Sequence, residues 1–257
     1  MQSKGYAVIT GGGRGIGAAT TVRLAQAGHD VAVLYHRDAE SAEATVARAV
    51  QAAAEQSRTV RGHALQVDVA DSAAVTAAFA GLDRVFAEQP LRVLVNNAGV
   101  LAAPAVAAEI APERIERMFA VTVFGSLYCA REAVRRMAQN LEGGAIVNVS
   151  SGASKSGSAF EFVDYAATKG AVDSFTIGLS RETAAQGIRV NAVRPGFIES
   201  DIHETIGDVA GRRARFLPQI PMRRTGSPDE VAAAIAWLAS EEASYVTGAL
   251  LDIAGGR

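Results

Sequence analysis

Short apolar segments rich in β-branched residues alternate along this chain with longer, alanine-rich segments whose apolar positions recur at helical spacing. Several short segments are apolar at nearly every position, which is typical of strands covered by helices on both sides of a parallel sheet. The pattern predicts strands at 6–10, 31–35, 61–67, 92–96, 145–150, 189–194 and 249–253. It predicts helices at 18–27, 39–54, 73–88, 110–139, 165–186 and 228–239.

This alternation indicates an α/β fold of the Rossmann type, a doubly wound and mostly parallel seven-stranded sheet with helices on both faces. No linker, repeat or low-complexity block divides the chain, so we expect one domain over residues 1–257. Residues 197–224 break the alternation with glycines, prolines and a cluster of arginines. Loops of this length in compact domains are usually functional or disordered, and we expect a substrate lid here.

Composition narrows the class of protein. The 25 basic and 27 acidic side chains nearly balance, which argues against nucleic-acid or membrane-surface binding. The single cysteine, Cys129, excludes an internal disulfide and is expected in the core. The four histidines show no metal-ligand spacing, so no metal is expected. The first apolar run, at 6–9, is too short for a signal peptide, and we expect a cytoplasmic protein.

A glycine-rich turn lies between the first predicted strand and the first helix. Residues 10–17 read Thr-Gly-Gly-Gly-Arg-Gly-Ile-Gly. Glycines at this junction let the backbone turn sharply and approach a pyrophosphate held by amides of the helix N-terminus. A glycine-rich surface turn is the alternative, but the strand–turn–helix context favours dinucleotide binding.

Tyr165 and Lys169 lie one helical turn apart, which places a phenol and an ammonium on the same helix face. A nearby cation lowers the pKa of a phenol toward the range that general acid/base chemistry needs. Only three lysines, Lys4, Lys155 and Lys169, occur among 25 basic residues, so a lysine here is less easily explained as surface filler. Ser150 and Ser151 end a strand at the carboxyl edge, where ligands of such sheets gather.

Together these motifs resemble the short-chain dehydrogenase/reductase family over essentially the whole chain. The glycine turn is similar to the family's cofactor turn, and 68–69 and 96–99 to its adenine-contact and sheet-stabilising motifs. Residues 194–198 resemble its nicotinamide-binding segment, and 245–248 and 255–256 its C-terminal end. The candidate cofactor-binding residues are Gly11, Arg14, Gly15, Ile16, Gly17, Arg37, Asp68, Val69, Asn96, Ala98, Gly99, Tyr165, Lys169, Pro195, Gly196 and Ile198.

The resemblance implies an NAD(P)-dependent oxidoreductase that transfers hydride between nicotinamide C4 and a small-molecule carbonyl or alcohol. Ser151, Tyr165 and Lys169 match the family's catalytic residues. Tyr165 is then the general acid/base, Lys169 lowers the Tyr165 pKa and holds the nicotinamide ribose, and Ser151 orients the substrate oxygen. The close Tyr–Lys spacing disfavours the family's enoyl reductases. The resemblance also implies a homotetramer built through the helices at 110–139 and 165–186.

Two departures from the family pattern bear on activity. Thr122 stands where the family usually has an asparagine that holds a water between the lysine and solvent. Ser151 lies 14 residues before Tyr165, one more than in many members, and a loop absorbs such an insertion easily. Thr122 alone favours the alternative function, a catalytically impaired dinucleotide-binding sensor or scaffold.

Cofactor choice depends on the end of the second strand. NAD enzymes place a carboxylate there for the adenine ribose, but this chain has Tyr35. Arg14 and Arg37 are suited to bracket a 2′-phosphate, which predicts NADP. Asp38 is within reach of a ribose and leaves NAD as the alternative.

The lid segment offers weaker signals, and the substrate itself is left open. His203 and the carboxylates of the stretch 199–204, which are Glu199, Asp201 and Glu204, are candidates for substrate contact. The arginine cluster suits either an anionic substrate or, more simply, a solvated lid face. Its members are Arg212, Arg213, Arg215, Arg223 and Arg224.

Overall fold

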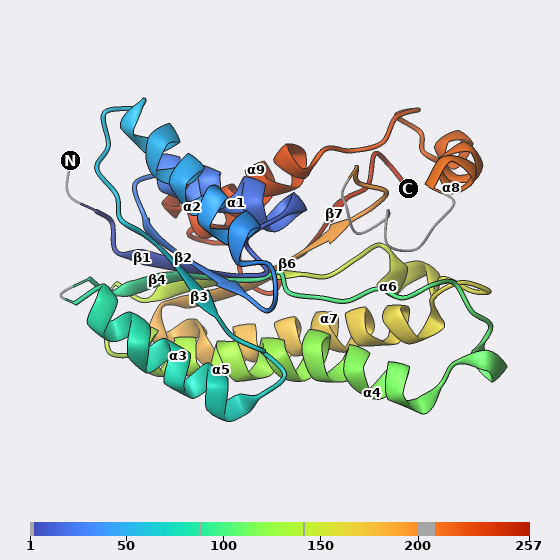
Figure 1. Cartoon of the computed structure of the whole chain (residues 1–257), viewed down its shortest axis with the longest axis horizontal. Coiled ribbons are helices and arrows are strands. Elements are labelled where there is room, and N and C mark those ends of the chain that lie inside the picture. The colour runs from blue at the N-terminus through green and yellow to red at the C-terminus, as the bar shows by residue number, and fades with distance from the viewer. Residues whose placement is uncertain (1–2, 88, 141, 200–208) are drawn as a thin grey trace.

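The computed structural model describes residues 3–87, 89–140, 142–199 and 209–257. Within these residues, seven strands form one sheet in the order β3-β2-β1-β4-β5-β6-β7, and every neighbouring pair is parallel (Figure 1). The strands are β1 Tyr6–Thr10, β2 Asp30–Tyr35, β3 Gly62–Gln66, β4 Leu91–Asn96, β5 Gly144–Val149, β6 Ile188–Pro195 and β7 Leu250–Ile253. The predicted doubly wound fold is confirmed.

Helices cover both faces of the sheet because its central strands alternate apolar side chains between two cores. Tyr6 and Val8 face one core, while Ala7 and Ile9 face the other. One layer contains α1 Gly15–Gln26, α2 Ala39–Ala54 and α9 Pro228–Ala239 (Figure 1). The opposite layer contains α3 Ser72–Val85, α4 Pro112–Phe119, α5 Gly125–Met137 and α7 Val163–Thr183 (Figure 1). Cys129 is buried in this second core, as expected.

The helix expected over 110–139 is wrong as one regular element. A π-helical turn, Ala120–Phe124, separates α4 from α5. A single wide turn shifts the register by about one residue, a change that the apolar spacing of an alanine-rich segment does not reveal. The turn matters because it contains Thr122, which is buried against the site described below.

The segment 197–224, expected to be a lid, lies partly outside the described residues, as do Asp201, His203 and Glu204. Its described parts are 197–199, which leave β6, and the short helix α8 Val209–Phe216 followed by a 3₁₀ turn at Leu217–Gln219. Another short helix, α6 Ala153–Ser156, follows β5. Among the described residues, no helix has the length and apolar character required to cross a bilayer.

Candidate active site

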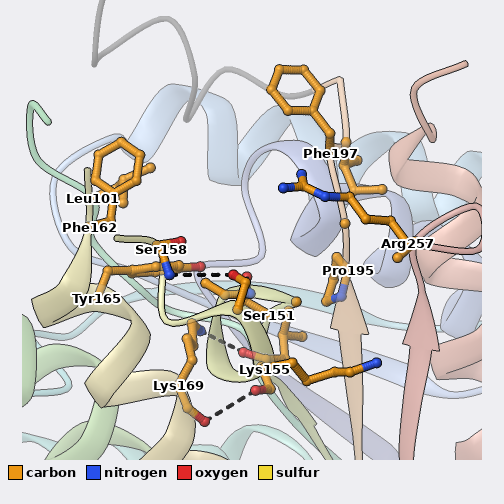
Figure 2. A pocket seen from close by; sticks show the side chains of 18 of the residues that line it. Leu101, Ser151, Lys155, Ser158, Phe162, Tyr165, Lys169, Pro195, Phe197 and Arg257 are labelled. Atoms are coloured by element: carbon orange, nitrogen blue, oxygen red, sulfur yellow. Dashed lines mark hydrogen bonds between the residues drawn. The ribbon is translucent and has the colours of Figure 1, made fainter. Parts of the chain in front are cut away.

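A cavity of about 350 Å³ opens at the carboxyl ends of the central strands (Figure 2). Its walls come from the glycine turn after β1, the ends of β4, β5 and β6, the start of α7, and α8. Parallel strands bring their carboxyl ends to the same sheet edge, so segments far apart in sequence converge here. The predicted residues Ile16, Gly99, Ser151, Tyr165, Lys169, Pro195, Gly196 and Ile198 all line this cavity.

Close contacts within the glycine turn leave no room for larger residues. Gly11 has φ +62°, and a Cβ on Gly17 would lie 2.3 Å from the Gly11 carbonyl oxygen. Asn97 fixes the turn from β4, since its Nδ2 donates to the carbonyls of Thr10 and Gly11, both at 3.0 Å. Helix α1 then starts at Gly15, so unpaired amides of its first turn lie at this edge. Larger side chains at Gly11 or Gly17 would destroy this cradle.

Asn96 and Asn97 face opposite sides of the sheet, as successive strand residues do. The Asn96 side chain donates to Asn148 Oδ1 at 2.9 Å and to the Ser126 carbonyl at 3.2 Å, away from the cavity. Asn97 lines the cavity but was not among the candidate cofactor residues. The alternation along β4 is the signal that distinguishes the two. Ala98 is tied by its amide to Thr10 Oγ1 at 2.9 Å.

Tyr165 lies in the first turn of α7 and faces Ser151 across the cavity floor (Figure 2). Burial raises the pKa of Tyr165 to about 12, while a hydrogen bond with the Ser151 side chain acts in the opposite direction. Ser151 Oγ also accepts the Ala153 amide at 3.1 Å. The Ser150 hydroxyl instead donates to the Lys169 carbonyl at 3.2 Å. Of the two serines, Ser151 is therefore the one presented to the tyrosine.

Lys169 is buried beneath the Tyr165 ring. Its Nζ donates to the Val149 carbonyl at 2.6 Å and lies 5.6 Å from the Tyr165 ring centroid. Burial lowers the pKa of Lys169 to about 8, and the nearby Asp173 carboxylate opposes this shift. Burial of the phenol is the larger influence on the Tyr165 pKa, and the lowering effect expected of Lys169 stays a prediction.

Thr122 and Lys169 border a small space beside Gly99. A Cβ on Gly99 would lie 3.8 Å from Thr122 Oγ1 and 3.7 Å from Lys169 Nζ. Thr122 Oγ1 is buried and has no hydrogen-bond partner among the described residues. A buried polar atom in this position is the kind of group that an ordered water satisfies.

Arg14 and Asp38 meet at the carboxyl end of β2, with Arg14 Nη1 at 3.6 Å from Asp38 Oδ2. Asp38 caps α2 by accepting the Ser41 amide at 3.0 Å. Hydrogen bonds from Ser41, followed by the Arg14 charge, lower the pKa of Asp38. Arg14 and Arg37 both present exposed guanidinium groups at this edge.

Asp68 and Val69 follow β3 at the same edge. Arg117 donates to both Asp68 oxygens, at 2.9 and 3.4 Å, and His36 Nε2 lies 3.6 Å from Oδ2. Arg117 and the Ala70 amide lower the pKa of Asp68 against the opposing effect of partial burial. Val69 is buried against α5, where a Cβ on Gly125 would lie 2.8 Å from Val69 Cγ2.

The outer wall of the cavity consists of residues that sequence reasoning did not select, apart from the arginine cluster. Leu101, Phe162, Phe197, Phe216 and Arg257 line it with Arg212. They come from five separate chain segments, and no local motif marks them. The structure also divides the arginine cluster, because Arg212 lines the cavity whereas Arg213, Arg223 and Arg224 are exposed.

Comparison with known proteins gives consistent matches along the whole chain. A family model described as enoyl-(acyl carrier protein) reductase matches residues 11–257. The uncharacterized oxidoreductase YgfF of Escherichia coli is 48% identical over 253 residues, covering 98% of this chain and 99% of that protein. The 3-oxoacyl-[acyl-carrier-protein] reductase FabG of Staphylococcus aureus is 34% identical over 256 residues, covering 100% and 99%.

Among solved structures, a short chain dehydrogenase from Burkholderia cenocepacia J2315, crystallised in complex with NADP, has a TM-score of 0.87. It is 33% identical in sequence, and the match covers 99% of this chain and 98% of that one. Fold, chain length and sequence therefore agree over the entire length.

Proposed function

This chain belongs to the short-chain dehydrogenase/reductase family and is an NAD(P)-dependent oxidoreductase, and from this premise we propose that it interconverts a small-molecule carbonyl and the corresponding alcohol with NADP(H). The observation that carries the proposal is that Ser151, Tyr165 and Lys169 line one cavity, with Lys169 Nζ 5.6 Å from the centroid of the tyrosine ring. The cofactor supplies a hydride donor or acceptor at nicotinamide C4.

The residues present fit a dinucleotide. The glycine cradle has no room for side chains at Gly11 and Gly17. It lies at the N-terminus of α1, beside the cavity-lining Ile16, which suits a pyrophosphate. Gly99, Pro195, Gly196 and Ile198 would hold the nicotinamide end. Asp68 and Val69 would hold adenine, and Ala98 would contribute backbone. Asn96 would act indirectly, by supporting the sheet edge from behind.

NADP is proposed as the preferred cofactor because the end of β2 presents Arg14 and Arg37 rather than a carboxylate at Tyr35. Asp38 is occupied with capping α2 and pairing with Arg14, which makes it less suited to a ribose hydroxyl. The NADP-bound Burkholderia relative supports this choice. NAD is the alternative cofactor.

Tyr165 is proposed as the general acid/base, donating its proton to the carbonyl oxygen during reduction and accepting it from the alcohol during oxidation. Ser151 hydrogen-bonds the same oxygen and orients it toward Tyr165. Lys169 holds positive charge next to the phenol and binds ribose hydroxyls. The close spacing of Tyr165 and Lys169 supports a carbonyl rather than an enoyl substrate.

A catalytically impaired sensor or scaffold is the competing function, and only Thr122 favours it. The juxtaposition of Ser151, Tyr165 and Lys169 in one cavity supports turnover instead. We further propose that the chain is a single domain that assembles as a homotetramer and that residues 197–224 form its substrate lid.

The test compares Tyr165→Phe with the wild type in NADPH consumption on a panel of aldehydes and ketones, and in fluorescence titration with NADPH and NADH. We expect Tyr165→Phe to abolish turnover and retain NADPH binding, because only the acid/base hydroxyl is lost. Both proteins should bind NADPH more tightly than NADH. Tyr245→Phe is the matched control, since Tyr245 is fully exposed. Undiminished turnover by Tyr165→Phe would overturn the catalytic assignment.

A further inference from the structure

Three arginines surround one aromatic ring at the outer end of the cavity. The guanidinium carbons of Arg212, Arg215 and Arg257 lie 5.8, 4.9 and 4.5 Å from the centroid of the Phe216 ring. Arg212 also lies 4.9 Å from the centroid of Phe162. Stacking on aromatic faces holds such groups in fixed orientations. Two of the three positive charges come from α8 and the third from Arg257, which is far from α8 in the sequence.

Arg212 is set apart from its neighbour on α8. Its side chain is 11% exposed and lines the cavity, whereas the side chain of Arg213 is 55% exposed and pairs with Glu199 at 3.3 Å. A solvated lid face accounts for Arg213. It does not account for Arg212, which lies between two phenylalanine rings on the wall of the cavity.

Arg257 joins the cluster from a segment outside α8. Figure 2 shows its guanidinium extending over the cavity near Phe197, across from Tyr165. No side-chain carboxylate within the described part of the chain forms an ion pair with Arg257. The Lys155 ammonium and the Asp252 carboxylate, which also line the cavity, pair with each other at 2.7 Å. The Asp252 charge is therefore neutralised by Lys155 rather than by Arg257.

The three guanidinium groups lie close to one another around Phe216. Among the described side chains, the Glu161 carboxylate pairs with Arg212, at 4.0 Å, and with Arg215. Like charges this close repel one another, and the repulsion increases where protein excludes water. An anion bound between them would relieve it, and arginine binds carboxylate and phosphate oxygens through paired hydrogen bonds.

We infer that the cavity binds a carbonyl or alcohol substrate that carries an anionic group, a carboxylate or a phosphate ester, which is held by Arg212 and Arg257 at the end away from Tyr165. This inference rests on the proposed function, since Tyr165 defines the reacting end. Leu101, Phe162 and Phe197 form an apolar wall between the two ends, which suits a short hydrocarbon or a single ring. The cavity of about 350 Å³ must also hold the nicotinamide end of the proposed cofactor, so the space left for the substrate favours a small molecule.

The test measures NADPH-dependent reduction of three aromatic aldehydes: para-formylbenzoate, para-formylphenyl phosphate and the neutral methyl para-formylbenzoate. We expect wild-type kcat/KM to be at least about tenfold higher for one of the anions than for the ester. The anion with the higher kcat/KM identifies the anionic group of the substrate as a carboxylate or a phosphate ester. Added salt should reduce this preference, because it screens the arginines. Equal kcat/KM values for anions and ester would overturn the inference and leave the proposed function standing.

Substitutions of single arginines test which of them cause the preference for an anionic substrate. Arg257→Gln, at an exposed position, and Arg212→Gln should each lower kcat/KM for the preferred anion by about tenfold or more, with the ester changed by less than about threefold. Arg213→Gln, one residue along α8, should leave all three substrates unaffected. A preference for the anion that survives both substitutions would overturn the assignment of these arginines.

Calorimetric titration of the NADP⁺-loaded protein with the two anionic aldehydes separates the inference from the proposed function. Binding without reduction, lost in Arg257→Gln, would support the anion site and count against the proposed catalysis. Absence of both binding and reduction would overturn the anion site.

Discussion

At the scale of single residues, burial shifts the pKa values of Lys169 and Tyr165 in opposite directions. Burial disfavours the charged form of each group, so the pKa of Lys169 falls to about 8 and that of Tyr165 rises to about 12. Both side chains are thereby kept closer to neutrality by the protein itself. The hydrogen bond from Ser151 and the charge of Asp173 work against this tendency.

Because Lys169 is buried, it should make the free energy of unfolding depend on pH. The unfolded chain holds its proton up to its ordinary pKa of 10.5, whereas the folded protein releases it near a pKa of 8. Between these values the unfolded state binds more protons, so the wild type gains stability as pH rises, relative to Lys169→Met, by about 1 kcal/mol per pH unit. Urea unfolding without cofactor from pH 8 to 10 measures this difference.

Lys4→Met is the matched control, because the Lys4 side chain remains in water. Its stability difference from the wild type should not change with pH over the same range. A Lys169→Met difference that is equally flat would show that the ammonium carries no burial cost.

Thr122 stands where the family usually has its water-holding asparagine, and we propose that its hydroxyl takes part in a proton relay from Lys169. Its buried hydroxyl borders the space beside Gly99 that Lys169 also faces. Thr122→Val removes the hydroxyl with little change of shape, and we expect kcat to fall roughly fivefold or more with the KM for NADPH unchanged. Thr122→Asn, which restores the family residue, should give an unchanged or higher kcat.

Thr183→Val provides the comparison for Thr122. Thr183 is equally buried but bonds to the carbonyls of Leu179 and Ile188, at the far end of α7. That substitution should lower stability and leave kcat unchanged. A large loss of kcat in Thr122→Asn would show that Thr122 does not stand in for the asparagine.

At the scale of elements, an ion pair fastens α4 to the start of α7, directly beside Tyr165. Arg114 donates to both oxygens of Asp164, at 2.6 and 3.1 Å, and to the Ala103 carbonyl at 2.6 Å. Asp164 is buried, and Arg114 is mostly so. The pair therefore ties three segments together: α4, the loop that follows β4, and the first turn of α7.

Asp164→Asn should lower the free energy of unfolding by about 3 kcal/mol, because it leaves the Arg114 charge buried without its counterion. Urea unfolding near neutral pH measures this loss. Arg114→Lys keeps the charge without the two parallel hydrogen bonds and should cost less. Glu182→Gln, exposed on the same helix, should change stability by less than about 0.5 kcal/mol. Equal stabilities of Asp164→Asn and Glu182→Gln would refute the role of the pair.

At the scale of the whole molecule, the layer of α4, α5 and α7 carries the surface on which a tetramer is proposed. Phe124 is 47% exposed at the π turn and packs beside Tyr128, with ring centroids 6.4 Å apart. Exposed aromatic side chains of this kind are common where subunits meet. The helices at 110–139 and 165–186, named from the sequence, belong to this layer.

Light scattering should give the wild type a mass four times that of the chain. Phe124→Glu should reduce this mass, because it places a charge in the proposed interface. Val85→Glu, at a similarly exposed apolar residue on α3, is the control and should retain the tetramer. A wild type that is monomeric at all concentrations would refute the assembly.

Elements and motifs that depend on neighbouring residues were accessible from the sequence. The strands could be located because apolar runs such as 92–96 are local, and the glycine cradle because Gly11 and Gly17 occupy a strand–helix junction. Tyr165 and Lys169 share a helix face through their spacing alone. The parallel sheet and its common carboxyl edge followed from the repeated alternation of strand and helix. The order of the strands came from the structure.

Tertiary structure was needed wherever the outcome depends on contacts between distant segments. It turned Asn97 rather than Asn96 toward the cavity. It separated Arg212 from Arg213 and brought Arg257 beside it. Burial and charge pairing arise from the packing of segments that lie far apart along the chain, and a pattern of neighbouring residues does not contain that information.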